Sequence, residues 1–171
     1  RRQRQMCIRD RVTFNEYFDT FVPASKQVGQ MQTLLENLYK QETTFGETDF
    51  SALCGHLGKH VNKRSFLVLY TNFSNMTSLN RQLVYLQQLA RQHRVLVVFF
   101  EDADLKEYIA GKSVTTEEYY RHVIAEKFAF EKRLIVSTLK QHGIYSLLTT
   151  PDKLSIDVIN KYLEMKSRQL L

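Results

Sequence analysis

Ser65-Phe66-Leu67-Val68-Leu69-Tyr70-Thr71-Asn72 is the stretch that decides the fold. Its apolar and aromatic residues form an uninterrupted run that stops at small polar side chains. Such a run is typical of a strand covered on both faces, and strands of that kind belong mainly to parallel sheets. In an open α/β sheet, ligands usually bind just past the carboxyl end of a central strand. We therefore expect the site of this chain at Thr71 and Asn72.

Downstream of this strand the sequence alternates between helical and strand patterns. Residues 79–93 repeat apolar side chains at helical spacing, and Val95 to Phe100 form a second apolar run. A helix between two buried strands is a βαβ unit, whose crossover is almost always right-handed and whose strands are parallel. Residues 144–148 predict a third strand, and residues 104–110 a short helix.

The long helix before the third strand carries clear end signals. Thr115 with Glu118 three residues later matches a capping box, and the helix is expected to run to about Gln141, with Gly143 as its C-terminal cap. We expect the Phe128-Ala129-Phe130 run within it to pack in the core. Ser155 is expected to cap a final helix that ends near Lys166.

Upstream of the organising strand, the sequence predicts a hairpin and two helices. Residues 11–14 and 19–22 are short β-type segments on either side of a polar connection. The helices are expected at residues 27–40 and 49–61, and each is expected to bury one apolar face. The face of the first consists of Val28, Met31, Leu34, Leu35, Leu38 and Tyr39. The predicted fold class is α/β, a doubly wound and mostly parallel sheet with an antiparallel edge hairpin.

Length and charge bound the domain organisation. A chain of 171 residues with 43% hydrophobic content suits one compact domain, and it has no apolar run long enough to span a membrane. Residues 1–11 carry five arginines and one aspartate, which leaves a net charge of only +2 on the remainder. The segment Met6 to Arg11 resembles a translated sequencing-library adapter. We expect residues 1–11 to be a non-native or disordered tail and residues 12–171 to be a single, partial domain.

Several kinds of chemistry are disfavoured by the residues. The glycines follow neither a phosphate-loop nor a dinucleotide pattern, and no nucleophile elbow is present. His56 and His60 lie one helical turn apart, but no Glu beside the first completes the zinc-protease arrangement, so we interpret them as histidines flanking an apolar face. Cys54 is the one cysteine outside the tail, which favours a reducing compartment.

Acidic residues follow the second strand, and they are the basis of an alternative hypothesis in which the chain is an enzyme. Glu101, Asp102 and Asp104 lie where a strand ends, and Glu101 or Asp102 is the candidate general base of a metal-dependent hydrolase or nucleotide-binding enzyme. The plainer reading is that Asp102 or Asp104 is a helix N-cap.

Three stretches resemble a known family. They are residues 13–49, which end in the Gly46-Glu47-Thr48-Asp49 turn, residues 64–73, and the closing Ile159-Asn160-Lys161-Tyr162-Leu163-Glu164-Met165-Lys166. Together they resemble the von Willebrand factor A-like domain of the bacterial domain-of-unknown-function family 58. Gln169 departs from the glycine often found near that end. The family's first strand and its Asp-x-Ser-x-Ser motif are expected upstream of Val12.

The resemblance implies a degenerate metal-ion-dependent adhesion site. Thr48 takes the family's threonine position and Asn72 its aspartate position, so a neutral amide replaces a carboxylate. Hard cations such as Mg²⁺ bind through several oxygens, including at least one carboxylate. We therefore expect a weak or empty metal site, no cofactor and no catalytic residue.

The resemblance also implies a scaffold that binds another protein. Members are commonly encoded beside MoxR-type AAA+ ATPases, and many carry N-terminal membrane helices that place this domain on the cytoplasmic side of the bacterial inner membrane. We expect Thr48, Asp49, Thr71 and Asn72 to form the partner-binding face. A nucleic-acid role would rest only on the arginine-rich tail, so no nucleic-acid partner is expected.

Overall fold

The computed structural model describes residues 11–14, 18–22, 30–40, 48–61, 63–73, 75–101 and 115–170. The chain divides into two compact units, Arg1–His60 and Val61–Leu171, and each is described by itself. The predicted short helix at residues 104–110 lies outside the described residues.

The second unit is built on a three-stranded parallel sheet. Its strands are β3 (Phe66–Tyr70), β4 (Arg94–Phe100) and β5 (Tyr145–Thr149), in the order β3-β4-β5. Phe66 is paired with Arg94 across the first ladder, and Leu96 with Tyr145 across the second. Residues 95–99 of the central strand β4 are all buried. Among the described strands β3 lies at the edge of this sheet, is mostly half-buried and leaves Tyr70 55% exposed, so the prediction of a central strand covered on both faces fits β4 and is wrong for β3. The predicted parallel βαβ arrangement is confirmed.

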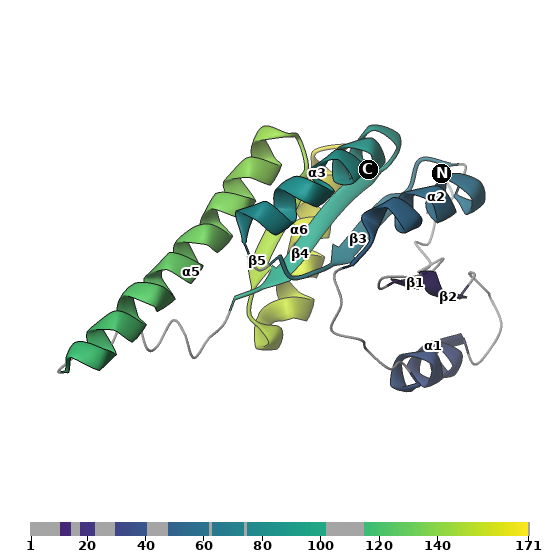
Figure 1. Ribbon diagram of the computed structural model, residues 1–171. Coiled ribbons are helices and arrows are strands. Elements are labelled where there is room, and N and C mark those ends of the chain that lie inside the picture. Colours follow the sequence, from purple (N-terminus) through teal and green to yellow (C-terminus); the bar gives the residue numbers. More distant parts are fainter. Residues whose placement is uncertain are drawn as a thin grey trace. The chain divides into compact units, whose positions relative to one another are not determined.

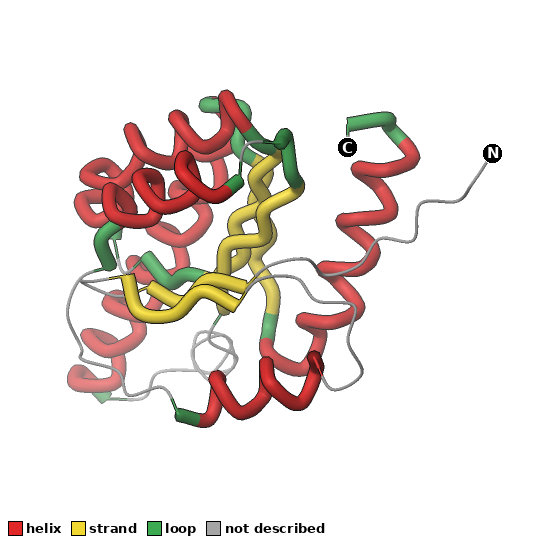
Figure 2. The backbone as a smooth tube through the Cα atoms, turned by 90° about the vertical axis from the view of Figure 1, so that its right-hand side faces the viewer, coloured by secondary structure: helices red, strands yellow, loops and turns green. Residues whose placement is uncertain are grey.

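Three helices cover the two faces of this sheet. Figures 1 and 2 show α3 (Met76–Gln92) and α5 (Thr116–Gln141) on one face and α6 (Leu154–Ser167) on the other. Each helix turns part of its apolar side chains, spaced at helical intervals, toward the sheet. The fully buried side chains that these helices contribute are Leu79, Leu86, Leu89, Ile135, Leu139 and Met165.

The ends of α5 agree with the sequence signals. Glu118 N–H donates to Thr115 Oγ1 at 3.2 Å, and Thr115 N–H donates to Glu118 Oε2 at 3.1 Å, so the capping box is present. Gly143 follows with φ +72°, a left-handed backbone that glycine adopts without a Cβ penalty. The core position predicted for Phe128 and Phe130 is wrong, because these side chains are 49% and 62% exposed.

The starts of α3 and α6 differ from the predictions. Helix α3 begins three residues early, at Met76, because Asn75 Oδ1 accepts a hydrogen bond from Ser78 N–H at 2.8 Å. Ser155 does not cap α6 but lies inside it. The 3-10 turn Pro151–Lys153 leads directly into this helix, and proline's fixed φ suits the first position of such a turn.

The first unit contains a hairpin and two helices. Strands β1 (Arg11–Phe14) and β2 (Phe18–Val22) are antiparallel, as predicted, with an irregularity between Thr13 and Phe14. In the described residues they form a two-stranded sheet of their own, so the predicted antiparallel edge on the parallel sheet is wrong. The irregularity interrupts a ladder that is already short, which limits how far this pairing extends.

Only one of the two helices in this unit buries its predicted face. Helix α2 (Phe50–His60) buries Phe50, Leu53 and Leu57, and the Phe50 ring meets the Phe14 ring edge to face at 5.3 Å between centroids. Helix α1 (Gln30–Tyr39) leaves most of its apolar face exposed. Helical spacing predicts which side chains share a face, but not whether a surface covers it. The exposed side chains are Met31, Leu35, Leu38 and Tyr39.

In the described part of the chain, no helix combines the length and the hydropathy that crossing a membrane requires.

Candidate functional site

The carboxyl edge of the parallel sheet begins at Thr71 and Asn72, directly after β3. Thr71 N–H donates to the carbonyl oxygen of Val98 at 3.1 Å, so the hydrogen-bond ladder with β4 continues one residue past the strand. The Thr71 side chain is half-buried and Asn72 is exposed. Asn75, three residues further along the chain, caps α3 with its side chain. Asn72 therefore presents its amide to solvent at the edge where ligands of open α/β sheets usually bind.

Glu101 extends the same edge on the neighbouring strand. Its N–H donates to the carbonyl oxygen of Thr149 at 2.9 Å, which ties the end of β4 to the end of β5. The Glu101 side chain is half-buried. Beside it, Lys132 Nζ from α5 donates to the carbonyl oxygen of Phe100 at 2.5 Å. A cation from the covering helix thus contacts the last carbonyl of the central strand.

Thr149 and Asp157 form a polar pair where β5 ends. Thr149 is only 3% exposed, and its hydroxyl donates to Asp157 Oδ2 at 2.5 Å. Thr149 Oγ1 also lies 3.3 Å from the carbonyl oxygen of Thr150. A buried hydroxyl needs such a partner, because an unsatisfied one costs about 1–3 kcal/mol. This carboxylate therefore holds the start of α6 against the end of β5.

Asp49, the one acidic member of the predicted partner-binding face, has a structural task in the first unit. Its Oδ1 accepts hydrogen bonds from Ser51 N–H at 2.7 Å and from Ala52 N–H at 3.3 Å, so it caps the N-terminus of α2. Burial first, and then the negative charge of Asp49, raise the pKa of the Cys54 thiol to about 11. A thiol with so high a pKa is a poor nucleophile at neutral pH.

Each unit contains two of the four predicted residues, which are neighbours in the sequence. Thr48 and Asp49 are both half-buried just before α2 in the first unit, and Thr71 and Asn72 follow β3 in the second. The union of the two pairs into one face stays a prediction.

The described residues offer neutral oxygens, and not a carboxylate cluster, to a cation. Within them, no group of three His, Cys, Asp or Glu side chains is arranged to hold a metal ion. Thr48 and Asn72 each have a neutral side-chain oxygen, which suits Mg²⁺ only when carboxylates join them. Asp102 and Asp104 lie outside the described residues.

The two histidines of α2 are stacked on each other. The rings of His56 and His60 lie 4.2 Å apart between centroids at 27°. Burial, followed by the nearby His60 and Lys59, lowers the pKa of His56. This geometry agrees with their interpretation as histidines that flank an apolar face.

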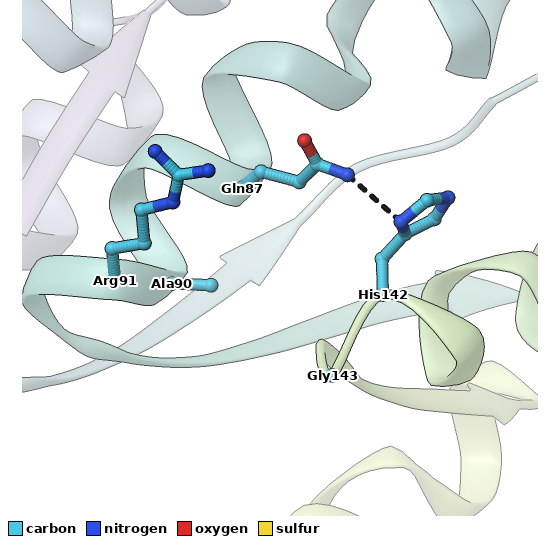
Figure 3. A pocket seen from close by; sticks show the side chains of 5 residues that line it. All are labelled: Gln87, Ala90, Arg91, His142 and Gly143. Atoms are coloured by element: carbon cyan, nitrogen blue, oxygen red, sulfur yellow. Dashed lines mark hydrogen bonds between the residues drawn. The ribbon is translucent and has the colours of Figure 1, made fainter.

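A shallow hollow lies at the opposite edge of the sheet, where α3 and α5 end. Gln87 Nε2 donates to His142 Nδ1 at 2.8 Å across it, as Figure 3 shows. The hollow has a volume of about 250 Å³, and Ala90, Arg91 and Gly143 complete its lining. The hydrogen bond between Gln87 and His142 links the C-terminal end of α3 to the C-terminal end of α5.

Thr149, Asp157 and Lys132 are edge residues that the sequence predictions missed. A usable signal was present, because Thr149 and Thr150 follow an apolar run in the same way that Thr71 and Asn72 do. No comparable signal marks Lys132, since its contact with β4 depends on how α5 crosses the sheet.

Comparison with protein-family models, with curated proteins and with solved structures finds no match to this chain.

Proposed function

We propose that this chain is a partial von Willebrand factor A-like domain of the bacterial domain-of-unknown-function family 58, and that it docks a protein without catalysing a reaction. The partner that we propose is a MoxR-type AAA+ ATPase. The observation that carries the proposal is the carboxyl edge of the parallel sheet, where Asn72 is exposed beside Thr71 at the end of β3. The resemblance of residues 64–73 to the family supplies the partner class.

The chemistry of the edge favours docking over catalysis. Of its carboxylates, Asp157 already accepts the Thr149 hydroxyl, which fixes the helix α6 in place. A general base must reach the proton that it removes within hydrogen-bond distance. Glu101 remains the candidate base of the alternative, a metal-dependent hydrolase or nucleotide-binding enzyme. That alternative requires a pocket that brings Glu101 near Asp49, and the hollow at Gln87 and His142 belongs to the opposite edge.

The cation site of the proposal is degenerate. Thr48 and Asn72 would supply two neutral oxygens, and a weakly held Mg²⁺ would at most bridge to the partner's carboxylate. We propose that the face formed by Thr48, Asp49, Thr71 and Asn72 binds the partner through these oxygens. In the full-length protein, the domain would lie on the cytoplasmic side of the inner membrane, as the family resemblance implies.

Co-purification tests the proposal. The chain is co-expressed with the MoxR-type ATPase of the same genome, and capture of the ATPase is compared among the wild type, Asn72→Ala and Asp49→Ala. Asp49→Asn keeps a capping oxygen, so it separates a lost contact from a frayed α2. Asn160→Ala, which changes another exposed asparagine, on α6, is the matched control.

Loss of the ATPase with Asn72→Ala, but not with Asn160→Ala, is the expected result. Intact binding in both Asn72→Ala and Asp49→Ala would mean that this face is not the contact. Hydrolysis of a phosphoester or nucleotide that is lost with Glu101→Gln would favour the enzyme.

A further inference from the structure

Helix α5 exposes seven large apolar side chains, and four of them form a stripe along one side of the helix. At about 100° per residue, its four members lie within about 60° of one another on the helix surface. Their exposed fractions are 60% for Tyr119, 45% for Val123, 62% for Phe130 and 40% for Leu134. We call these four residues the α5 stripe.

The α5 stripe points away from the core of its own unit. The buried residues of the same helix, Ala125, Ile135 and Leu139, cluster on roughly the opposite side of the helical wheel. Figure 1 shows that the first half of α5 extends beyond the carboxyl ends of the strands. The sheet therefore cannot cover the stripe, since α5 packs on the sheet with its other side.

Several large exposed apolar side chains on one helix favour an interaction with another surface. Single exposed apolar side chains are ordinary, whereas contiguous patches of several hundred Å² mark interaction sites. Aromatic side chains also dominate the energetics of interfaces, because each can bury about 150–250 Å². Tyr119 at one end of the α5 stripe and Phe130 within it are such side chains.

We propose that the α5 stripe is the interface of a homodimer in which α5 pairs with α5 of a second copy in antiparallel orientation. The intervals along the stripe are four, seven and four residues, so the pattern is symmetric about the bond between Glu126 and Lys127. Reversal of the helix places Tyr119 opposite Leu134 of the second copy. It also places Val123 opposite Phe130 of the second copy, so every stripe residue meets an apolar side chain.

The charges at the centre of the stripe select the antiparallel orientation. In that arrangement Glu126 of each copy meets Lys127 of the other, and both side chains are exposed. A parallel pair would place Glu126 against Glu126 and Lys127 against Lys127, and such like-charge contacts are unfavourable. Glu126 also lies 3.5 Å from His122 of its own helix, which leaves its second oxygen for Lys127. A two-fold axis through this point gives the isologous interface typical of dimers.

Sedimentation equilibrium of the 171-residue chain tests the dimer. The wild type is expected to dimerise, and Phe130→Glu is expected to weaken the dimer by at least about 100-fold, because the substitution acts once in each copy. Val84→Glu is the matched control, since Val84 is an equally exposed apolar residue, on α3, at 66%. Circular dichroism confirms that both variants are folded.

Disulfide trapping tests the orientation. In a background with Cys7→Ser and Cys54→Ser, a mixture of Tyr119→Cys and Leu134→Cys chains is expected to form a covalent heterodimer under mild oxidation, whereas either variant alone is not. At ~1.5 Å per residue, residue 119 of one copy and residue 119 of the other lie about 20 Å apart in the antiparallel pair, which is too far for a disulfide between them.

Four results would overturn the proposal. They are a wild-type chain that stays monomeric up to about 100 µM, a dimer that tolerates Phe130→Glu, and self-crosslinking of Tyr119→Cys alone. The fourth is binding of the monomer to anionic vesicles through the same stripe, which would make the stripe a membrane contact.

Discussion

Removal of the Asp49 side chain separates the structural role of this residue from its proposed role in docking. Asp49 Oδ1 accepts from Ser51 N–H at 2.7 Å and from Ala52 N–H at 3.3 Å. Asp49→Ala leaves both donors without this partner at the start of α2, while Asp49→Asn keeps an oxygen in the same place but removes the charge.

The magnitudes follow from the cap and from the helix dipole. Loss of an N-cap oxygen costs about 0.5–2 kcal/mol, with about 1 as the typical value. Loss of a negative charge at a helix N-terminus costs about 0.3–1 kcal/mol more. We expect Asp49→Ala to destabilise the first turn of α2 by about 1.5 kcal/mol and Asp49→Asn by about 0.5 kcal/mol.

Amide hydrogen exchange read by NMR measures this effect locally. Destabilising the closed turn by about 1.4 kcal/mol makes amide exchange about tenfold faster. The Ser51 and Ala52 amides should therefore exchange about tenfold faster in Asp49→Ala and about twofold faster in Asp49→Asn. Equal protection of these two amides in Asp49→Ala and in the wild type would contradict the capping role of Asp49.

The Cys54 thiol supplies a second readout of Asp49. Burial and the Asp49 charge together raise its pKa to about 11. In a Cys7→Ser background, Asp49→Asn should lower this pKa, because it removes the negative charge that disfavours the thiolate. Alkylation at pH 8–9 should therefore be faster, although burial, the larger cause of the shift, remains. An unchanged alkylation rate would show that the Asp49 charge does not reach the thiol.

Three further predictions concern buried polar groups and the cation site. His93 is 3% exposed, its Nδ1 accepts from Ser65 N–H at 3.3 Å, and burial lowers its pKa. As the pH drops, the imidazole is therefore protonated in the unfolded chain before it is protonated in the folded one. The free energy of unfolding falls as the pH drops from about 6.5 toward the folded-state pKa. His93→Asn keeps an acceptor without titrating, so urea unfolding at pH 7 and pH 5 should differ less than for the wild type, and equal differences would contradict this. Thr149→Val should cost about 1–3 kcal/mol because Asp157 loses its donor, whereas Thr149→Ser should cost only about 1 kcal/mol for the lost methyl group; equal losses in urea unfolding would rule out the hydroxyl as the cause. Titration calorimetry with Mg²⁺ or Mn²⁺ should give dissociation constants well above micromolar for the wild type and tighter binding for Asn72→Asp, and micromolar binding by the wild type would contradict the degenerate site.

The parallel half of the fold could be predicted from the sequence because its signals are local and agree with one another. The apolar run at residues 66–70 predicts a strand, and the run at residues 95–100 repeats it after one amphipathic helix. The capping box at Thr115 fixed the start of α5 to the residue, since both of its hydrogen bonds join residues three apart.

The wrong predictions arose where the outcome depends on distant partners. A helical apolar face can cover a core or remain exposed, and the sequence pattern of α1 and of Phe128 to Phe130 is the same in both cases. The placement of the hairpin depends on strand pairing between segments far apart in the chain. For the site, Thr71 and Asn72 could be placed at a strand end, but Asp49's role as a cap takes hydrogen-bond geometry to recognise.

The measurement that most directly tests the proposed docking function is the amide-exchange footprint of the MoxR-type ATPase on this chain. If the carboxyl edge of the sheet is the docking surface, the amides of residues 71–73 become protected in the complex, while those of residues 91–94 at the opposite edge do not change. Protection at residues 91–94 with none at residues 71–73 would place the partner elsewhere and contradict the account.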